Sequence, residues 1–178
     1  YLSTINKIYI VACGTPMHAG LVGKTIIERL CSIPVEVDIA SEFRYRDPII
    51  DDKTLCIYIS QSGETADTLA SLREAKKRGA FTLSIVNVLF STIARESDGV
   101  IYTNAGAEIA VATTKAYMLQ VAILSLLAYK AALSKGYKND SVMNEVKMIP
   151  RMVREILDRR DDYKEIANEI YKSSSVFF

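Results

Sequence analysis

Short apolar runs alternate with helical stretches along most of this chain. The apolar runs are continuous rather than alternating in polarity, which is typical of strands buried on both faces of a parallel sheet. This order predicts an α/β fold: a three-layer α/β/α domain around an open, doubly wound, five-stranded parallel sheet. We expect strands at 7–12, 35–39, 55–60, 81–88 and 99–104, and helices at 16–31, 64–78 and 113–135.

The tail differs from the rest of the chain. Residues 138–172 are charged and helical in pattern, and we expect Pro150 to begin or kink a helix. The final "SSSVFF" (173–178) has the pattern of a beginning strand. We therefore predict a domain over 1–137 and a helical extension over 138–178 that leads into a second unit of a longer protein.

Composition excludes several classes of function. The 178 residues carry a net charge of +1, so nucleic acid is not expected as the main partner. The apolar stretch 116–133 contains Gln120, Ser125 and Lys130, which favours a buried helix over a membrane span. Three cysteines and one histidine form no metal-binding pattern, so neither a metal nor another cofactor is expected. Cysteines inside apolar segments suit a reducing cytoplasm.

Ligands of open parallel sheets bind at the carboxyl ends of the strands. The segment "SQSGETADT" (60–68) lies at such an end and crowds hydroxyl groups at the start of a helix. Helix N-termini suit phosphate, and Ser60, Ser62 and Thr65 would add hydroxyl donors. Alternatively, Ser62 caps the helix while Glu64 and Asp67 complement its dipole. A cap needs one hydroxyl, so the crowding favours an anionic ligand, from which both acidic side chains would have to point away.

Two further loops follow strands, "ACGTPMHAG" (12–20) and "NAGAEIAVATTKAY" (104–117). The first lacks the glycines of a dinucleotide fingerprint, since Pro16 follows "GT". The segment "GLVGKT" (20–25) is no phosphate-binding Walker loop, because His18 stands where the first glycine belongs. A nucleotide-binding α/β domain is therefore the weakest of the readings that we keep open.

Several motifs occur together in a familiar order: "ACGT", "VEVDIASEFRYR", "SQSGETADTL", "RESD" and "NAGAEIAVATTKAY". From Lys7 to Phe178 the chain resembles the first of two sugar isomerase (SIS) domains in the isomerase region of the glutamine–fructose-6-phosphate aminotransferase family. The resemblance implies a flavodoxin-like SIS domain from a cytoplasmic enzyme that makes glucosamine 6-phosphate from fructose 6-phosphate and glutamine. It also implies that one of these sugar phosphates is bound by Cys13, Gly14, Thr15, Ser60, Gln61, Ser62, Thr65, Val111, Ala112 and Thr113.

The chain departs from the family pattern in places. Pro16 stands where the family has a serine, and Leu89 and Phe90 stand where glycine and serine are usual. The catalytic lysine, glutamate and histidine of the isomerase lie after this region, and the glutaminase cysteine lies before it. We therefore expect sugar-phosphate binding without catalysis by this chain alone; the alternative is a regulatory SIS module that senses a phosphosugar. The apolar stretch 116–133 and the tail predict a homodimer.

Overall fold

The computed structural model describes residues 2–108, 113–137 and 141–176. The chain divides into two units, Tyr1–Lys138 and Asn139–Phe178, and each is described by itself. The first unit contains the sheet and the candidate site.

A parallel sheet of five strands in the order β2-β1-β3-β4-β5 forms the centre of the first unit. This is the flavodoxin-like, doubly wound order, and it confirms the predicted fold class. The strands are β1 (Lys7–Ala12), β2 (Val35–Ile39), β3 (Thr54–Ser60), β4 (Phe81–Val86) and β5 (Gly99–Tyr102). The helices of this unit are α1 (Thr15–Cys31), α2 (Ala40–Phe43), α3 (Ala66–Lys77), α4 (Thr92–Glu96) and α5 (Lys115–Ser134).

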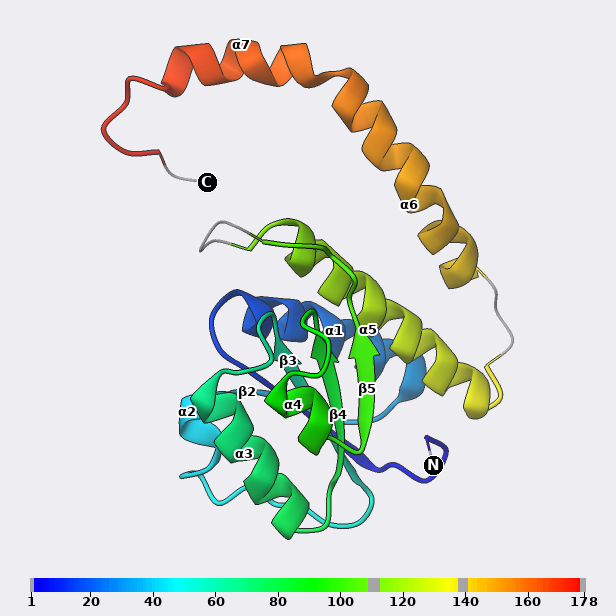
Figure 1. Cartoon of the computed structure of the whole chain (residues 1–178). Helices are drawn as coiled ribbons and strands as arrows, with labels where there is room; N and C mark the ends of the chain where they lie inside the picture. Colours follow the sequence, from blue (N-terminus) through cyan, green and yellow to red (C-terminus); the bar gives the residue numbers. More distant parts are fainter. Residues whose placement is uncertain (1, 109–112, 138–140, 177–178) are drawn as a thin grey trace. The chain divides into compact units, whose positions relative to one another are not determined.

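Helices cover both faces of the sheet (Figure 1). Successive residues of a strand point to opposite faces, so Ile8 and Ile10 pack in one cluster with α1 and α5. Tyr9 and Val11 pack in the other cluster, with α2, α3 and α4. The continuous apolar pattern of the strands therefore has its cause in this two-sided burial. The short helices α2 and α4 were not predicted, and β4 and β5 each end two residues earlier than expected.

The helix α5 is long and apolar enough, by length and composition, to cross a membrane. In the structure one side of it is buried against the core. Leu124 is fully buried beside Gly23 of α1, and the Cys31 thiol donates a hydrogen bond to the Ala128 carbonyl at 3.2 Å. This packing agrees with the core helix expected from the polar residues inside the stretch.

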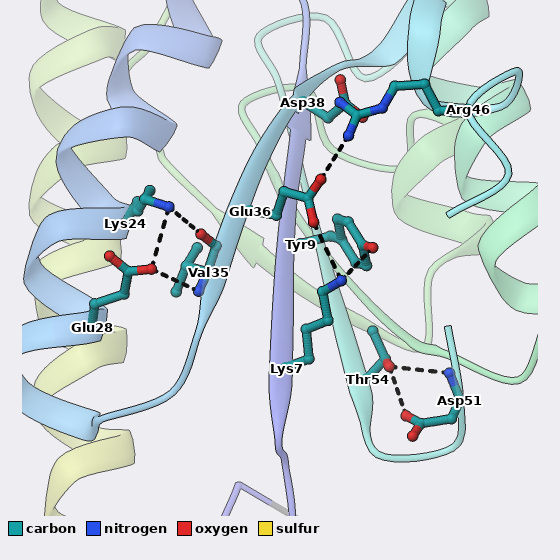
Figure 2. A network of polar contacts seen from close by, with 10 residues as sticks. All are labelled: Lys7, Tyr9, Lys24, Glu28, Val35, Glu36, Asp38, Arg46, Asp51 and Thr54. Carbon is teal, nitrogen blue, oxygen red and sulfur yellow. Dashed lines mark hydrogen bonds and ion pairs between the residues drawn. The ribbon is translucent and has the colours of Figure 1, made fainter. Parts of the chain in front are cut away.

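A polar network lines the β2 edge of the sheet (Figure 2). Glu36 of β2 lies 3.2 Å from Lys7 of β1 and 2.7 Å from Arg46. Arg46 also pairs at 2.9 Å with Asp38, whose side chain is 7% exposed. These ion pairs hold the segment after α2 against the edge strand β2. The unpaired backbone groups on the outer side of an edge strand can otherwise form hydrogen bonds with a strand of another molecule.

The second unit consists of α6 (Ser141–Asp158) and α7 (Arg160–Ile170). Pro150 lies inside α6, so of the two expected roles it does not begin the helix, and the kink at this position stays a prediction. Of the strand expected at 173–178, residues 173–176 form no strand in the structure, and residues 177 and 178 lie outside the described residues. A strand needs a neighbour to accept its backbone hydrogen bonds, and the described residues of this unit offer only helices.

Candidate functional site

A cleft opens at the carboxyl edge of the sheet, where the direction of the strand order changes between β1 and β3. The helices that follow these strands, α1 and α3, lie on opposite faces, so their N-termini flank one crevice. The cleft has a volume of about 440 Å³, within the range of small-molecule sites. Its lining residues are Cys13, Gly14, Thr15, Pro16, Ile59, Ser60, Gln61, Ser62, Thr65, Glu108 and Thr113.

Eight of the ten residues expected at the site are brought together in this cleft: Cys13, Gly14, Thr15, Ser60, Gln61, Ser62, Thr65 and Thr113. They come from three loops that are far apart in the sequence: the first within 12–20, the second at 60–65 and the third within 104–117. Val111 and Ala112 lie outside the described residues. Glu108 lines the cleft and was not among the expected residues, although it belongs to the same third loop.

The second loop, 60–65, is a compact turn held by its own hydroxyl groups. The Ser60 hydroxyl oxygen accepts a hydrogen bond from the Gly63 N–H and lies 3.0 Å from the Thr65 hydroxyl oxygen. Ser60 is buried, so its hydroxyl shapes the turn from beneath. Ser62 is exposed, and its oxygen accepts from the Glu64 N–H at 3.2 Å. That arrangement leaves the Ser62 hydroxyl hydrogen for donation to a ligand.

The helix α3 begins at Ala66, two residues later than expected, with Thr65 as its N-cap. The Ser62 cap that we kept as an alternative is not formed, and among the described residues no side chain caps the helix by a hydrogen bond. The first N–H groups of this 12-residue helix are therefore left without the usual side-chain acceptor beside the cleft. Unpaired N–H groups and the positive end of the helix dipole both favour an anion there.

Both acidic residues near this helix start are held by other partners. The Glu64 carboxylate accepts a hydrogen bond from the Thr92 N–H at 2.7 Å, at the start of α4. This backbone hydrogen bond holds the pKa of Glu64 below its ordinary value. Asp67 lies 3.9 Å from the Arg44 guanidinium. Neither of these two acidic residues is among the described residues that line the cleft, as anion binding at the start of α3 requires.

Gly63 allows the turn to lie against the segment that precedes α4. Its φ is +66°, and a Cβ at this position would fall 2.0 Å from the Ser91 hydroxyl oxygen. The Ile93 N–H donates to the Gly63 carbonyl at 3.0 Å. The turn is thus docked onto α4 by this hydrogen bond and by the neighbouring contact of Glu64. Only glycine combines this backbone conformation with so close an approach.

The first loop brings Gly14, Thr15 and Pro16 to the opposite side of the cleft. Gly14 is the N-cap of α1, and Thr15 and Pro16 begin the helix. Proline is well suited to this first turn, where its missing N–H costs no helical hydrogen bond. It also removes one N–H and the hydroxyl of the usual serine from the cleft, so fewer donors remain on this side.

The third loop contributes Glu108 and Thr113. The Glu108 carboxylate accepts from the Ala116 N–H at 3.3 Å, which places a negative group at the start of α5. This contact joins residues on either side of a segment that lies outside the described residues. One signal for Glu108 is visible along the chain, namely an acidic residue in a glycine-containing loop eight positions before Ala116.

Donors and acceptors in the cleft belong to neutral groups, apart from Glu108. Among its described lining residues there is no lysine or arginine. An anion would therefore be held by N–H groups and hydroxyls rather than by a cation. The Gln61 Oε1 atom is buried, and it has no hydrogen-bond partner among the described residues. Its natural partner would be a donor such as a sugar hydroxyl.

The rejected "GLVGKT" segment and the cysteine Cys56 play structural roles. Gly23 and Lys24 of the "GLVGKT" segment lie within α1, where the Lys24 ammonium donates to the Val35 carbonyl (Figure 2). Burial raises the pKa of the Cys56 thiol to about 12, so this cysteine is neutral and unreactive at neutral pH.

Comparison with known proteins identifies the fold family. The model of the SIS domain family matches residues 1–130. The chain belongs to the SIS domain family. A glutamine–fructose-6-phosphate aminotransferase (isomerizing) from Clostridium tetani is 54% identical over 99% of this SIS chain. Its counterpart from Caldanaerobacter subterraneus is 50% identical, also over 99% of the chain. The chain spans about 30% of the length of these relatives.

Solved structures give the same assignment. The C-terminal domain of glucosamine-fructose-6-phosphate aminotransferase from Francisella tularensis is 40% identical, with a TM-score of 0.87. The match covers 94% of this SIS chain and 48% of that chain. A glucosamine-6-phosphate deaminase from Thermotoga maritima is 25% identical, with a TM-score of 0.71, over 82% of this chain and 45% of that one. The family resemblance stated from the motifs is thus confirmed.

Proposed function

We propose that this SIS domain binds the sugar phosphate in the isomerase region of a glutamine–fructose-6-phosphate aminotransferase. The ligand is fructose 6-phosphate or glucosamine 6-phosphate. The observation that carries the proposal is the N-terminus of α3, which has no side-chain cap among the described residues and stands beside the exposed Ser62 hydroxyl in a cleft. The names of the relatives, which match along 99% of the chain, supply the sugar.

The phosphate and the sugar occupy different parts of the cleft in this proposal. The Ser62 and Thr65 hydroxyls and the first N–H groups of α3 hold the phosphate, since these donors meet at one helix start. Ser60 and Gly63 keep the turn in shape. Gln61 accepts a hydrogen bond from a sugar hydroxyl, while Cys13, Gly14 and Thr15 line the sugar. The third loop, with Val111, Ala112 and Thr113, completes the contact with the sugar.

Binding and catalysis are separate in this proposal. Amination of fructose 6-phosphate needs ammonia, an acid–base group and a residue that opens the sugar ring, and these are proposed to come from other parts of the whole protein. Residues 1–137 would be the binding domain, and 138–178 would lead to a second SIS unit. The relatives are about three times as long as the chain, which supports this division. Homologous names over nearly the whole chain favour the enzyme over a phosphosugar sensor.

A homodimer in the cytoplasm completes the proposal. Exposed apolar side chains on α1 and α5 support self-association, among them Leu21 (46% exposed) and Met118 (57% exposed). Three free cysteines suit a reducing compartment. Light scattering at high concentration tests the dimer, and a single monomeric species would contradict it for this chain.

The Ser62→Ala variant tests the phosphate assignment. Loss of one hydrogen bond to a charged group should weaken binding of fructose 6-phosphate by roughly 1.5–3 kcal/mol. Calorimetric titration of both proteins measures this difference. Ser97→Ala is a matched control, because the Ser97 hydroxyl donates to the Ile93 carbonyl on α4 and does not line the cleft. Equal affinity of the Ser62 variant and the unmodified chain would refute the assignment.

A further inference from the structure

Asn87 follows β4 and lies between two loops of the cleft. It does not line the cleft itself, yet its side chain and backbone reach both the second and the third loop. We propose that Asn87 is a positioning residue that fixes the third loop, and with it the sugar end of the cleft, relative to the phosphate-binding turn. This inference rests on the proposed function and deepens it.

Among the described residues, the side chain of Asn87 makes three hydrogen bonds, one to Thr103 just after β5 and two to the third loop. Its Oδ1 accepts from the Thr103 hydroxyl at 2.9 Å and from the Ala105 N–H at 2.8 Å. Its Nδ2 donates to the Gly106 carbonyl at 2.8 Å. One amide side chain thus fixes successive polar groups of a segment that has no regular secondary structure.

The orientation of this amide follows from its partners. The Ala105 N–H can only donate, and the Gly106 carbonyl can only accept, so Oδ1 must face the first and Nδ2 the second. An aspartate has the same shape but would direct a carboxylate oxygen at the Gly106 carbonyl. Asn87→Asp therefore removes one hydrogen bond and adds a repulsion without changing the volume of the side chain.

The backbone of Asn87 provides the link to the second loop. Its N–H donates to the Gln61 carbonyl at 3.3 Å. The turn that follows Gln61 has separate anchors, from Ser60 within the loop and from the contacts of Gly63 and Glu64 with α4. A change of the Asn87 side chain should therefore loosen the third loop and leave the phosphate-binding turn in place.

This separation makes the inference specific. The residues that Asn87 holds, Ala105 and Gly106, lie just before Glu108, which lines the cleft and contacts the start of α5. If Asn87 sets the position of this loop, its side chain controls contacts with the sugar and not those with the phosphate. A residue that merely supported the fold would affect both parts of the ligand alike.

The experiment compares the unmodified chain with Asn87→Asp, Asn87→Ala and the control Val88→Ala. Val88 is the next residue in the chain, and it is 47% exposed. Each protein is titrated with fructose 6-phosphate and with inorganic phosphate, and unfolding curves confirm that it is folded. We expect the Kd for fructose 6-phosphate to rise about tenfold in both Asn87 variants, which corresponds to about 1.4 kcal/mol. The Kd for inorganic phosphate should stay within about twofold, since its donors are untouched.

The outcomes separate this inference from the proposed function. Unchanged affinity for both ligands in folded Asn87 variants overturns the positioning role. A parallel loss of affinity for both ligands also overturns it, because the residue would then support the whole cleft. If the unmodified chain binds neither ligand, the proposed function fails, and the inference fails with it. Amide exchange gives an independent readout: the Ala105 N–H should exchange faster in Asn87→Ala than in Val88→Ala.

Discussion

Gly63→Ala is the substitution whose effect the structure defines most closely. The added Cβ would lie 2.0 Å from the Ser91 hydroxyl oxygen and 2.5 Å from the Ser91 Cβ. The backbone conformation at φ +66° adds about 1–2 kcal/mol for a residue with a Cβ. Overpacking against Ser91 adds roughly 1–3 kcal/mol. The variant should therefore lose about 2–5 kcal/mol of unfolding free energy.

Gly79→Ala separates the two contributions. Gly79 has a φ of +93°, and no described residue beyond its chain neighbours places a heavy atom within 4 Å of a Cβ built there. This control carries the conformational cost and the same change in the unfolded chain, but no clash. Urea denaturation of both variants should show a difference of roughly 1–3 kcal/mol.

A second substitution tests whether the contact with Ser91 causes the loss of stability. Ser91→Gly in the Gly63→Ala background removes the two atoms with which the new Cβ would clash, so it should restore part of the lost stability. Binding of fructose 6-phosphate should follow the same order, since the clash displaces the turn that carries Ser62. If Gly63→Ala is no more destabilising than Gly79→Ala, the docking of this turn onto the segment before α4 is wrong.

Three further predictions concern single side chains. The pKa of Glu64 lies below its ordinary value of 4.5, so its stabilising contribution is complete above pH 4.5 and is lost as pH falls through the folded pKa. Glu64→Gln should flatten the decline of the urea midpoint in that acid range; an equally steep decline would contradict this. Phe90→Gly should raise the unfolding free energy by about 0.5–1 kcal/mol, because Phe90 has a positive φ and is largely exposed; lower stability would contradict it. Arg46→Ala should lower the thermal midpoint more than Arg44→Ala, since only Arg46 pairs with the buried Asp38; equal midpoints would contradict it.

The sheet and its order could be predicted from the sequence because burial on both faces produces short apolar runs that are visible locally. The central strands β1 and β3 are nearly continuous apolar runs, whereas the edge strand β2 alternates with Glu36 and Asp38. The long helices follow the strands in the pattern of a doubly wound fold. The short helices α2 and α4 leave no such local pattern, since neither is long enough to show a helical period. Residues 173–176 of the strand expected at 173–178 form no strand, and residues 177–178 lie outside the described part of the chain. Strand formation depends on a neighbour that the local pattern cannot supply.

The site could be predicted only in part. The hydroxyl-rich turn was visible from its composition, and the motifs located the other loops. The partners of Glu64 and Asp67 could not be found this way, because Thr92 and Arg44 lie more than 20 residues away in sequence. The role of Asn87 could not be predicted either, because a single asparagine after a strand is no local signal of a functional residue. Its importance depends on tertiary hydrogen bonds to residues 16–19 positions further along.

The crystal structure of this chain with fructose 6-phosphate is the most direct test of the central claim. We expect the phosphate oxygens to lie within hydrogen-bond distance, about 2.5–3.2 Å, of the Ser62 hydroxyl and of N–H groups in the first turn of α3. The sugar should extend toward Gly14 and the third loop. A phosphate bound elsewhere, or a cleft without ligand at saturating fructose 6-phosphate, would contradict the account.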